Sequence, residues 1–202
     1  MVITYPVGRS LYVNMTNRCP CSCLFCIRNN GSGVYGSGSL WLEREPSVQE
    51  IVDSIGSRNL EEFDELVFCG YGEPTERLED LLLVAGHVRK THAQLKIRLN
   101  TNGLSDLING KPTAAKLKGL VDTVSISLNT PDEKEYERIC RPKFGIRSWR
   151  ALVDFAASCR GVVPQVVMSV VGEPVTSPED VDRCRAIAES VGAVLRVRSY
   201  EE

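Results

Sequence analysis

The sequence lacks long hydrophobic runs, and its positive and negative charges nearly balance. The longest apolar stretches, such as Leu81 to Ala85, are far too short to cross a bilayer. The formal net charge is only −2, which gives no support to bulk binding of nucleic acid or of an anionic membrane. The N-terminus also lacks the basic segment and apolar core of a secretory signal. We therefore expect a soluble, cytoplasmic protein.

Histidine is scarce as well, and repeats and low-complexity tracts are absent. The chain has only 2 histidines, His87 and His92, and neither belongs to a pattern of catalytic partners. No linker is long enough to mark a second domain. With 202 residues, of which 43% are hydrophobic, residues 1–202 are predicted to form one domain. Within it we assign a cysteine loop to residues 16–30 and a flexible Gly- and Ser-rich segment to residues 29–39.

Cysteine, by contrast, is concentrated in one place. Half of the 8 cysteines lie in the stretch Cys-Pro-Cys-Ser-Cys-Leu-Phe-Cys, where Cys19, Cys23 and Cys26 have CxxxCxxC spacing and Cys21 is an additional thiol. Thiolates this close bind a soft metal or a cluster, or they cross-link. A reducing compartment disfavours disulfides, and the first three thiols are too close in sequence to pair without strain. If Cys21 were a fourth ligand, the loop would form a closed zinc or electron-transfer site.

The rest of the chain alternates between strand-like and helix-like segments. Ser47 is predicted to cap one helix, and Ser177 with Pro178 another, which ends before Gly192. Alternation of this kind predicts parallel βα units with right-handed crossovers. Six units are too few for a closed eight-stranded barrel. The predicted fold is α/β, a (βα)6 partial TIM barrel open on one side, and a flat doubly wound sheet is the alternative. The expected strands are 11–15, 64–69, 94–99, 123–128, 165–171 and 194–197.

Three of these strands have one polar face. In residues 94–99, Ile97 and Leu99 alternate with Arg98, and residues 123–128 and 194–197 alternate in the same way. Strands that helices cover on both faces read instead as continuous apolar runs. We therefore expect the polar faces to point into a barrel interior that is wet or filled by a ligand. The alternative is that these strands lie at an exposed edge or pair buried ions.

The turns that follow the first four strands carry the polar and glycine-rich residues. They are the cysteine loop, Gly70 to Pro74, Asn100 to Gly103 and the turn that begins at Asn129. Functional loops of parallel α/β folds gather at the carboxyl ends of the strands. The four turns are therefore predicted to form one site.

These motifs together resemble those of the radical S-adenosylmethionine (SAM) superfamily. They are the CxxxCxxC loop with the aromatic Phe25 before its last cysteine, and the Gly-Glu-Pro turn after the second strand, on a (βα)6 pattern. The short chain, the cysteine loop and the segment from Ile139 to Gly145 are also similar to small radical SAM proteins associated with TatD-type hydrolases. The resemblance implies a [4Fe-4S] cluster held by Cys19, Cys23 and Cys26, with Cys21 as a bystander.

The same resemblance implies the chemistry. Three thiolates leave one iron of the cluster open to the amino and carboxylate groups of SAM. An electron from a reductant such as flavodoxin or ferredoxin then splits SAM, and the resulting 5'-deoxyadenosyl radical abstracts hydrogen from a small molecule or a partner protein. Arginines on the predicted inner face indicate an anionic substrate.

Several residues are implied as SAM ligands, and the catalytic residues that act on the substrate are not predicted. Phe25 is expected near the adenine, and the turn of Gly70, Gly72 and Glu73 near the methionine amino group. Candidates for the ribose and the SAM carboxylate come from strand ends. A glycyl-radical-enzyme activase is the alternative, but activases carry Asp and Lys near the positions of Asn100 and Asn129, and this departure disfavours that alternative. These candidates are Asn100, Ser127, Asn129, Ser169 and Arg198, with Arg98 as a second cation.

Overall fold

The computed structural model describes residues 1–29 and 36–199. Within these residues, seven strands form one sheet whose spatial order equals their order in the chain. β1 (Thr4–Val7) pairs with β2 (Ser10–Val13) in antiparallel fashion, and each later pair is parallel. The later strands are β3 (Glu65–Phe68), β4 (Lys96–Thr101), β5 (Thr123–Ser127), β6 (Gln165–Val171) and β7 (Val194–Arg198).

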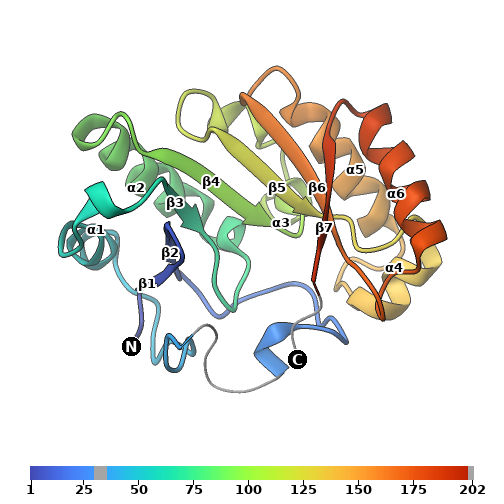
Figure 1. The fold of residues 1–202 in the computed structure, drawn as a ribbon, viewed down its shortest axis with the longest axis horizontal. Coiled ribbons are helices and arrows are strands. Elements are labelled where there is room, and N and C mark those ends of the chain that lie inside the picture. The colour runs from blue at the N-terminus through green and yellow to red at the C-terminus, as the bar shows by residue number, and fades with distance from the viewer. Residues whose placement is uncertain (30–35, 200–202) are drawn as a thin grey trace.

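This topology decides between the two predicted architectures. A doubly wound sheet needs a point where the strand order reverses, and the order from β1 to β7 contains none within the described residues. The open partial barrel is therefore confirmed, and the flat doubly wound sheet is wrong. Figure 1 shows the helices along the outer side of a curved row of strands.

The helices lie between successive parallel strands, as βα units require. Among the described residues, no helix is long and apolar enough to span a membrane. The predicted cap at Ser47 is confirmed, because its side chain accepts from Glu50 N while the Glu50 carboxylate accepts from Ser47 N. The helices are α1 (Val48–Gly56), α2 (Leu78–Thr91), α3 (Ser105–Asn109), α4 (Glu133–Cys140), α5 (Arg147–Cys159) and α6 (Pro178–Ser190). Short 3-10 turns are η1 (Ile27–Asn29), η2 (Leu60–Glu62), η3 (Pro74–Arg77) and η4 (Ala114–Leu117).

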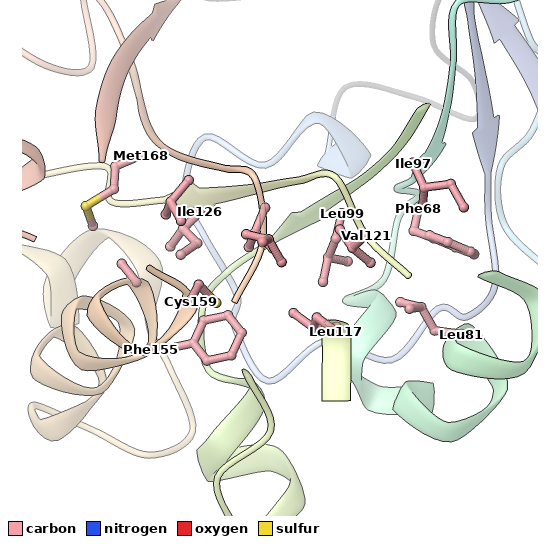
Figure 2. Close-up of a cluster of buried hydrophobic side chains, with 14 of the residues drawn as sticks. Phe68, Leu81, Ile97, Leu99, Leu117, Val121, Ile126, Phe155, Cys159 and Met168 are labelled. Atoms are coloured by element: carbon pink, nitrogen blue, oxygen red, sulfur yellow. The ribbon is translucent and has the colours of Figure 1, made fainter. Parts of the chain in front are cut away.

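The hydrophobic core lies between the outer face of the sheet and the helices. Figure 2 shows Leu99, Ile126 and Met168, from three successive strands, on the side of Phe155 and Cys159 of α5. The three strand residues are fully buried, and burying each such side chain contributes about 1.5–3 kcal/mol. Helices thus cover the apolar faces of β4, β5 and β6.

The opposite face of the sheet is polar. The strand register places Asn100 beside Ser125, and it places Ser127, Ser169 and Arg196 in one row across β5, β6 and β7. The prediction of a polar inner face is confirmed for these strands. The opposite, apolar face is incompletely covered at β7, where Val197 is 47% exposed at the edge of the sheet.

Some element boundaries also differ from the predicted ones. The strand expected at 94–99 runs from 96 to 101, so Asn100 and Thr101 belong to β4 and not to the following turn. The β1–β2 hairpin, the short helix α3 and the turn η4 were not predicted. Part of the segment predicted to be flexible, residues 30–35, lies outside the described residues.

Candidate functional site

The turns after β2, β3, β4 and β5 meet at one end of the sheet. Glu73 N of the β3 turn donates to Arg18 O at the start of the cysteine loop, at 2.8 Å. Asn102 Nδ2 of the β4 turn lies 3.9 Å from the sulfurs of both Cys19 and Cys21. The prediction that these turns gather at the carboxyl ends of the strands is therefore confirmed.

Gly70 and Gly72 let the β3 turn press against the chain that leads into the cysteine loop. A Cβ atom on Gly70 would lie 2.1 Å from Asn14 Oδ1, and one on Gly72 would lie 2.2 Å from Thr16 O and 2.7 Å from Arg18 O. Real Cβ atoms essentially never come this close. Glycine is thus needed here to hold the cysteine loop in place, whatever ligand also binds at the turn.

The carboxylate of Glu73 points into the protein. It is 4% exposed, and its Oε1 accepts from Thr75 N at 3.0 Å, Thr75 Oγ1 at 2.7 Å and Thr101 Oγ1 at 2.8 Å. Its Oε2 accepts from Asn102 N at 2.7 Å. Burial raises the pKa of Glu73, while these hydrogen bonds oppose the shift. Glu73 therefore ties the β3 turn to the β4 turn, and its contact with the SAM amino group stays a prediction.

The four thiols of the cysteine loop fall into two environments. Cys21 is buried, at 3% exposure, whereas Cys19, Cys23 and Cys26 are only partly buried. Hydrogen bonding to Cys19, and to a smaller extent to Cys23, raises the pKa of the Cys21 thiol. The same interaction with Cys21 lowers the pKa of the Cys19 thiol. Burial, and then the neighbouring Cys21, raise the pKa of Tyr136 in α4. Cys21 is thus part of the core, which sets it apart from the three thiols at CxxxCxxC spacing.

These three thiols fit an iron–sulfur cluster better than a single ion. In the part of the chain that the structure describes, no three His, Cys, Asp or Glu side chains are arranged to hold one metal ion. A cubane cluster instead takes each thiolate on a separate iron. Partly exposed thiols on one short loop, with soft sulfur donors only, match that requirement.

Cys140, which lies far from the cysteine loop in the sequence, packs against that loop. It ends α4 and is fully buried. Ser22 N donates to Cys140 O at 3.0 Å, and Leu24 N donates to Ile139 O at 2.9 Å. Hydrogen bonds from Cys140 and then Cys21 lower the pKa of Cys23 to about 4. The only signal for this contact in the sequence is the segment from Ile139 to Gly145, which resembles that of the TatD-associated proteins but does not indicate a role for Cys140.

The predicted SAM ligands on β5 and β6 lie close together. Ser127 and Ser169 are partners in the strand register, and the Asn129 amide N–H donates to Ser169 O at 3.2 Å. Asn129 adopts a left-handed conformation with φ 65°. Among the described residues, Asn129 Oδ1 and Asn100 Oδ1 are buried and have no hydrogen-bond partner. A hydroxyl or amine of a ligand would satisfy both oxygens.

The candidate cations and Phe25 differ in their surroundings. Arg98 donates to the Glu65 carboxylate at 2.7 Å, so its charge is balanced within the sheet. Arg198 ends β7 and lies close enough to Cys69 for its charge to lower that thiol's pKa, which burial raises overall. Cys69 directly follows β3 and is only partly buried. Phe25 is partly buried and packs against the core.

Comparison with known proteins gives a consistent result. The family model described as "Radical SAM superfamily" matches residues 13–190. GTP 3',8-cyclase of Corynebacterium glutamicum strain R is 29% identical over 202 residues, covering 94% of this chain and 48% of the cyclase. The enzyme of the same name from strain ATCC 13032 is 29% identical over 177 residues, covering 82% and 42%. The chain thus spans about half the length of the curated relatives it matches.

Solved structures share the fold at low sequence identity. A radical SAM methyltransferase from Sphaerobacter thermophilus superposes with a TM-score of 0.66 at 17% identity, covering 96% of this chain and 56% of that one. A structure described as native anSMEcpe with bound AdoMet gives 0.60 at 17% identity, covering 95% and 51%. The matched family region encloses the cysteine loop and all three partner turns. The chain therefore belongs to the radical SAM superfamily of enzymes.

Proposed function

We propose that this protein holds one [4Fe-4S] cluster on Cys19, Cys23 and Cys26 and uses it to cleave SAM reductively and act on an anionic substrate. One observation carries the proposal. The three thiols at CxxxCxxC spacing stay partly exposed at the carboxyl end of a parallel sheet, while Cys21 is buried in the core.

When bound, the cluster supplies an open iron for SAM and the electron that splits it into methionine and a 5'-deoxyadenosyl radical. The chain's own residues bind and orient SAM. Because the Glu73 carboxylate is held by protein donors, the turn of Gly70, Gly72 and Glu73 would offer its backbone carbonyls to the amino group. Phe25 would lie near the adenine. A reductant such as flavodoxin or ferredoxin would deliver the electron.

The polar strand ends would hold the remainder of SAM. The buried amide oxygens of Asn100 and Asn129 need donors, which ribose hydroxyls supply, and Ser127 and Ser169 lie beside them. Arg198, at the end of β7, is the first candidate for the SAM carboxylate, and Arg98, which is paired with Glu65, is the second. Paired in this way, Arg98 contributes little net charge to the site.

An anionic substrate is supported by the charges of the inner face. Arg196 and Arg198 share that face with Arg98, whose own charge is balanced by Glu65. Two of the matched relatives are GTP cyclases by name, which is consistent with an anionic substrate. Oriented guanidinium groups bind carboxylates and phosphates well.

Single cysteine replacements test the proposal. After anaerobic reconstitution we expect about four irons per chain in the wild type and in the Cys21→Ala variant. Alanine at Cys19, Cys23 or Cys26 is expected to abolish the stable cluster. Cys184→Ala is the matched control, because Cys184 is fully buried in α6.

The measurements are iron and sulfide content and the visible spectrum. A colourless wild type that holds zinc, and loses it when Cys21 is replaced, would show a closed thiolate site and refute the proposal.

A further inference from the structure

Cys140 is fixed beside Cys23 by the backbone, although the two residues are 117 positions apart. The bonds Ser22 N to Cys140 O and Leu24 N to Ile139 O lie on either side of Cys23. Main-chain hydrogen bonds therefore hold the backbones of Cys23 and Cys140 side by side, whichever rotamers the two thiols adopt.

The segment from Ile139 to Lys143, here called the 139–143 strap, is anchored at a further point. Lys143 N donates to Pro20 O at 2.8 Å. Arg141 caps the C-terminus of α4 in a left-handed conformation, with φ 45°, and its N–H donates to Glu137 O. The strap thus runs along the cysteine loop from Pro20 to Leu24, and rotation of the Cys23 side chain toward a metal would leave this contact in place.

Asn129 sets the direction of the hydrogen bond that Cys140 makes. Its Nδ2 lies 3.4 Å from Cys140 Sγ, and an amide nitrogen can only donate. The backbone of Asn129 is held by Ser169 O, which its N–H contacts at 3.2 Å, and by Thr176 Oγ1, which donates to its carbonyl at 3.1 Å. Because the Cys140 sulfur accepts from Asn129, its own S–H is left to donate, and the Cys23 sulfur lies against the same residue, 3.7 Å from Cys140 O.

The other buried cysteines outside the loop show that this arrangement is specific. Cys159 and Cys184 are also fully buried and belong to the hydrophobic core, and burial raises the pKa of each to about 12. Neither has a side-chain hydrogen bond within the described residues, whereas Cys140 has polar partners on both sides. Space filling alone would not require them.

We propose that Cys140 is a positioning residue that donates a hydrogen bond from its thiol to the sulfur of Cys23, with Asn129 orienting it, and thereby raises the reduction potential of the cluster. The inference rests on the proposed function, because Cys23 must be a cluster ligand. A hydrogen bond to a ligating sulfur stabilises the more negative, reduced cluster. Cys140 itself does not bind iron.

The test compares wild type, Cys140→Ala, Cys140→Ser and Cys184→Ala after anaerobic reconstitution. Iron per chain and the midpoint potential, from a redox titration followed by EPR, are measured on each. Cys140→Ala is expected to keep the iron and to lower the ratio of reduced to oxidised cluster at a fixed potential about threefold, a shift of about 28 mV for one electron. Cys140→Ser keeps a donor and Cys184→Ala is remote, so both should match wild type.

The outcomes separate the alternatives. Wild-type potentials in both Cys140 variants would show that the thiol only fills space, which overturns the proposal. Loss of iron in both would make Cys140 a ligand, which also overturns it. If alanine leaves a destabilising cavity, Cys140→Val lacks a donor, fills the space and should show the same shift. A wild type that binds no iron would instead contradict the proposed function.

Discussion

Replacing Gly72 with alanine tests whether the β3 turn positions the cysteine loop. The added Cβ would lie 2.2 Å from Thr16 O, whereas ordinary contacts begin at 3.4 Å. The two segments must therefore separate by about 1.2 Å at this point. Thr16 O and Arg18 O are backbone atoms, and the hydrogen bond from Glu73 N to Arg18 O joins the same two segments. The clash therefore cannot be relieved by rotating a side chain.

Overpacking of this kind costs about 1–3 kcal/mol in the free energy of unfolding. For a domain of this size, 1 kcal/mol corresponds to about 2–4 °C, so the melting temperature should fall by about 2–12 °C. Because Thr16 and Arg18 directly precede Cys19, the displaced loop should also take up less iron. Thermal unfolding followed by circular dichroism and an iron assay after reconstitution measure the two effects.

Gly56→Ala is the matched control. Gly56 is the last residue of α1 and a Cβ there would meet nothing within 4 Å. Alanine should stabilise the protein by about 0.4–1 kcal/mol through the unfolded chain. A Gly72→Ala variant that melts at the wild-type temperature and takes up a full complement of iron would refute the role assigned to this turn.

Two further predictions concern carboxylates. Glu73→Gln places an amide NH₂ among donors that point at a carboxylate in the wild type. Chemical unfolding should show that the free energy of unfolding falls by about 1–3 kcal/mol. A loss no larger than that of Glu61→Gln, at an exposed position, would contradict the geometry. Hydrogen bonds from Arg44 and then Ser47 lower the pKa of Glu50 to about 2. A pKa that is lower in the folded than in the unfolded protein stabilises the fold at pH values above the unfolded-state pKa of about 4.3, and this stabilisation is lost as the pH falls toward 2. The difference in melting temperature between wild type and Glu50→Gln should therefore vanish toward pH 2. An undiminished difference at that pH would contradict the linkage.

Elements that local sequence determines were predictable. The strand at 165–171 has the predicted boundaries, and Ser177 caps α6 with Pro178 in the first turn. These signals act within a few residues through side-chain alternation and capping. The gathering of the turns also followed from the sequence, because parallel βα units bring the carboxyl ends of strands to one edge.

Features that depend on contacts between distant segments were not predictable. The Glu73 carboxylate turns inward because Thr101 and Asn102 of the next βα unit supply donors, and no pattern near Glu73 indicates them. Cys140 reaches Cys23 through the end of α4, a contact that helix periodicity cannot show. The boundary of β4 shifted because pairing of Asn100 and Thr101 with β5 outweighs their preference for turns.

The central claim is that the cysteine loop holds a cluster that cleaves SAM. The most direct measurement is the amount of 5'-deoxyadenosine and methionine that anaerobically reconstituted protein forms from SAM with a strong reductant. We expect equal amounts of the two products, and none in the Cys23→Ala variant, because that variant lacks one of the three thiolates that hold the cluster. A protein that carries the full iron complement and leaves SAM intact under these conditions would contradict the account.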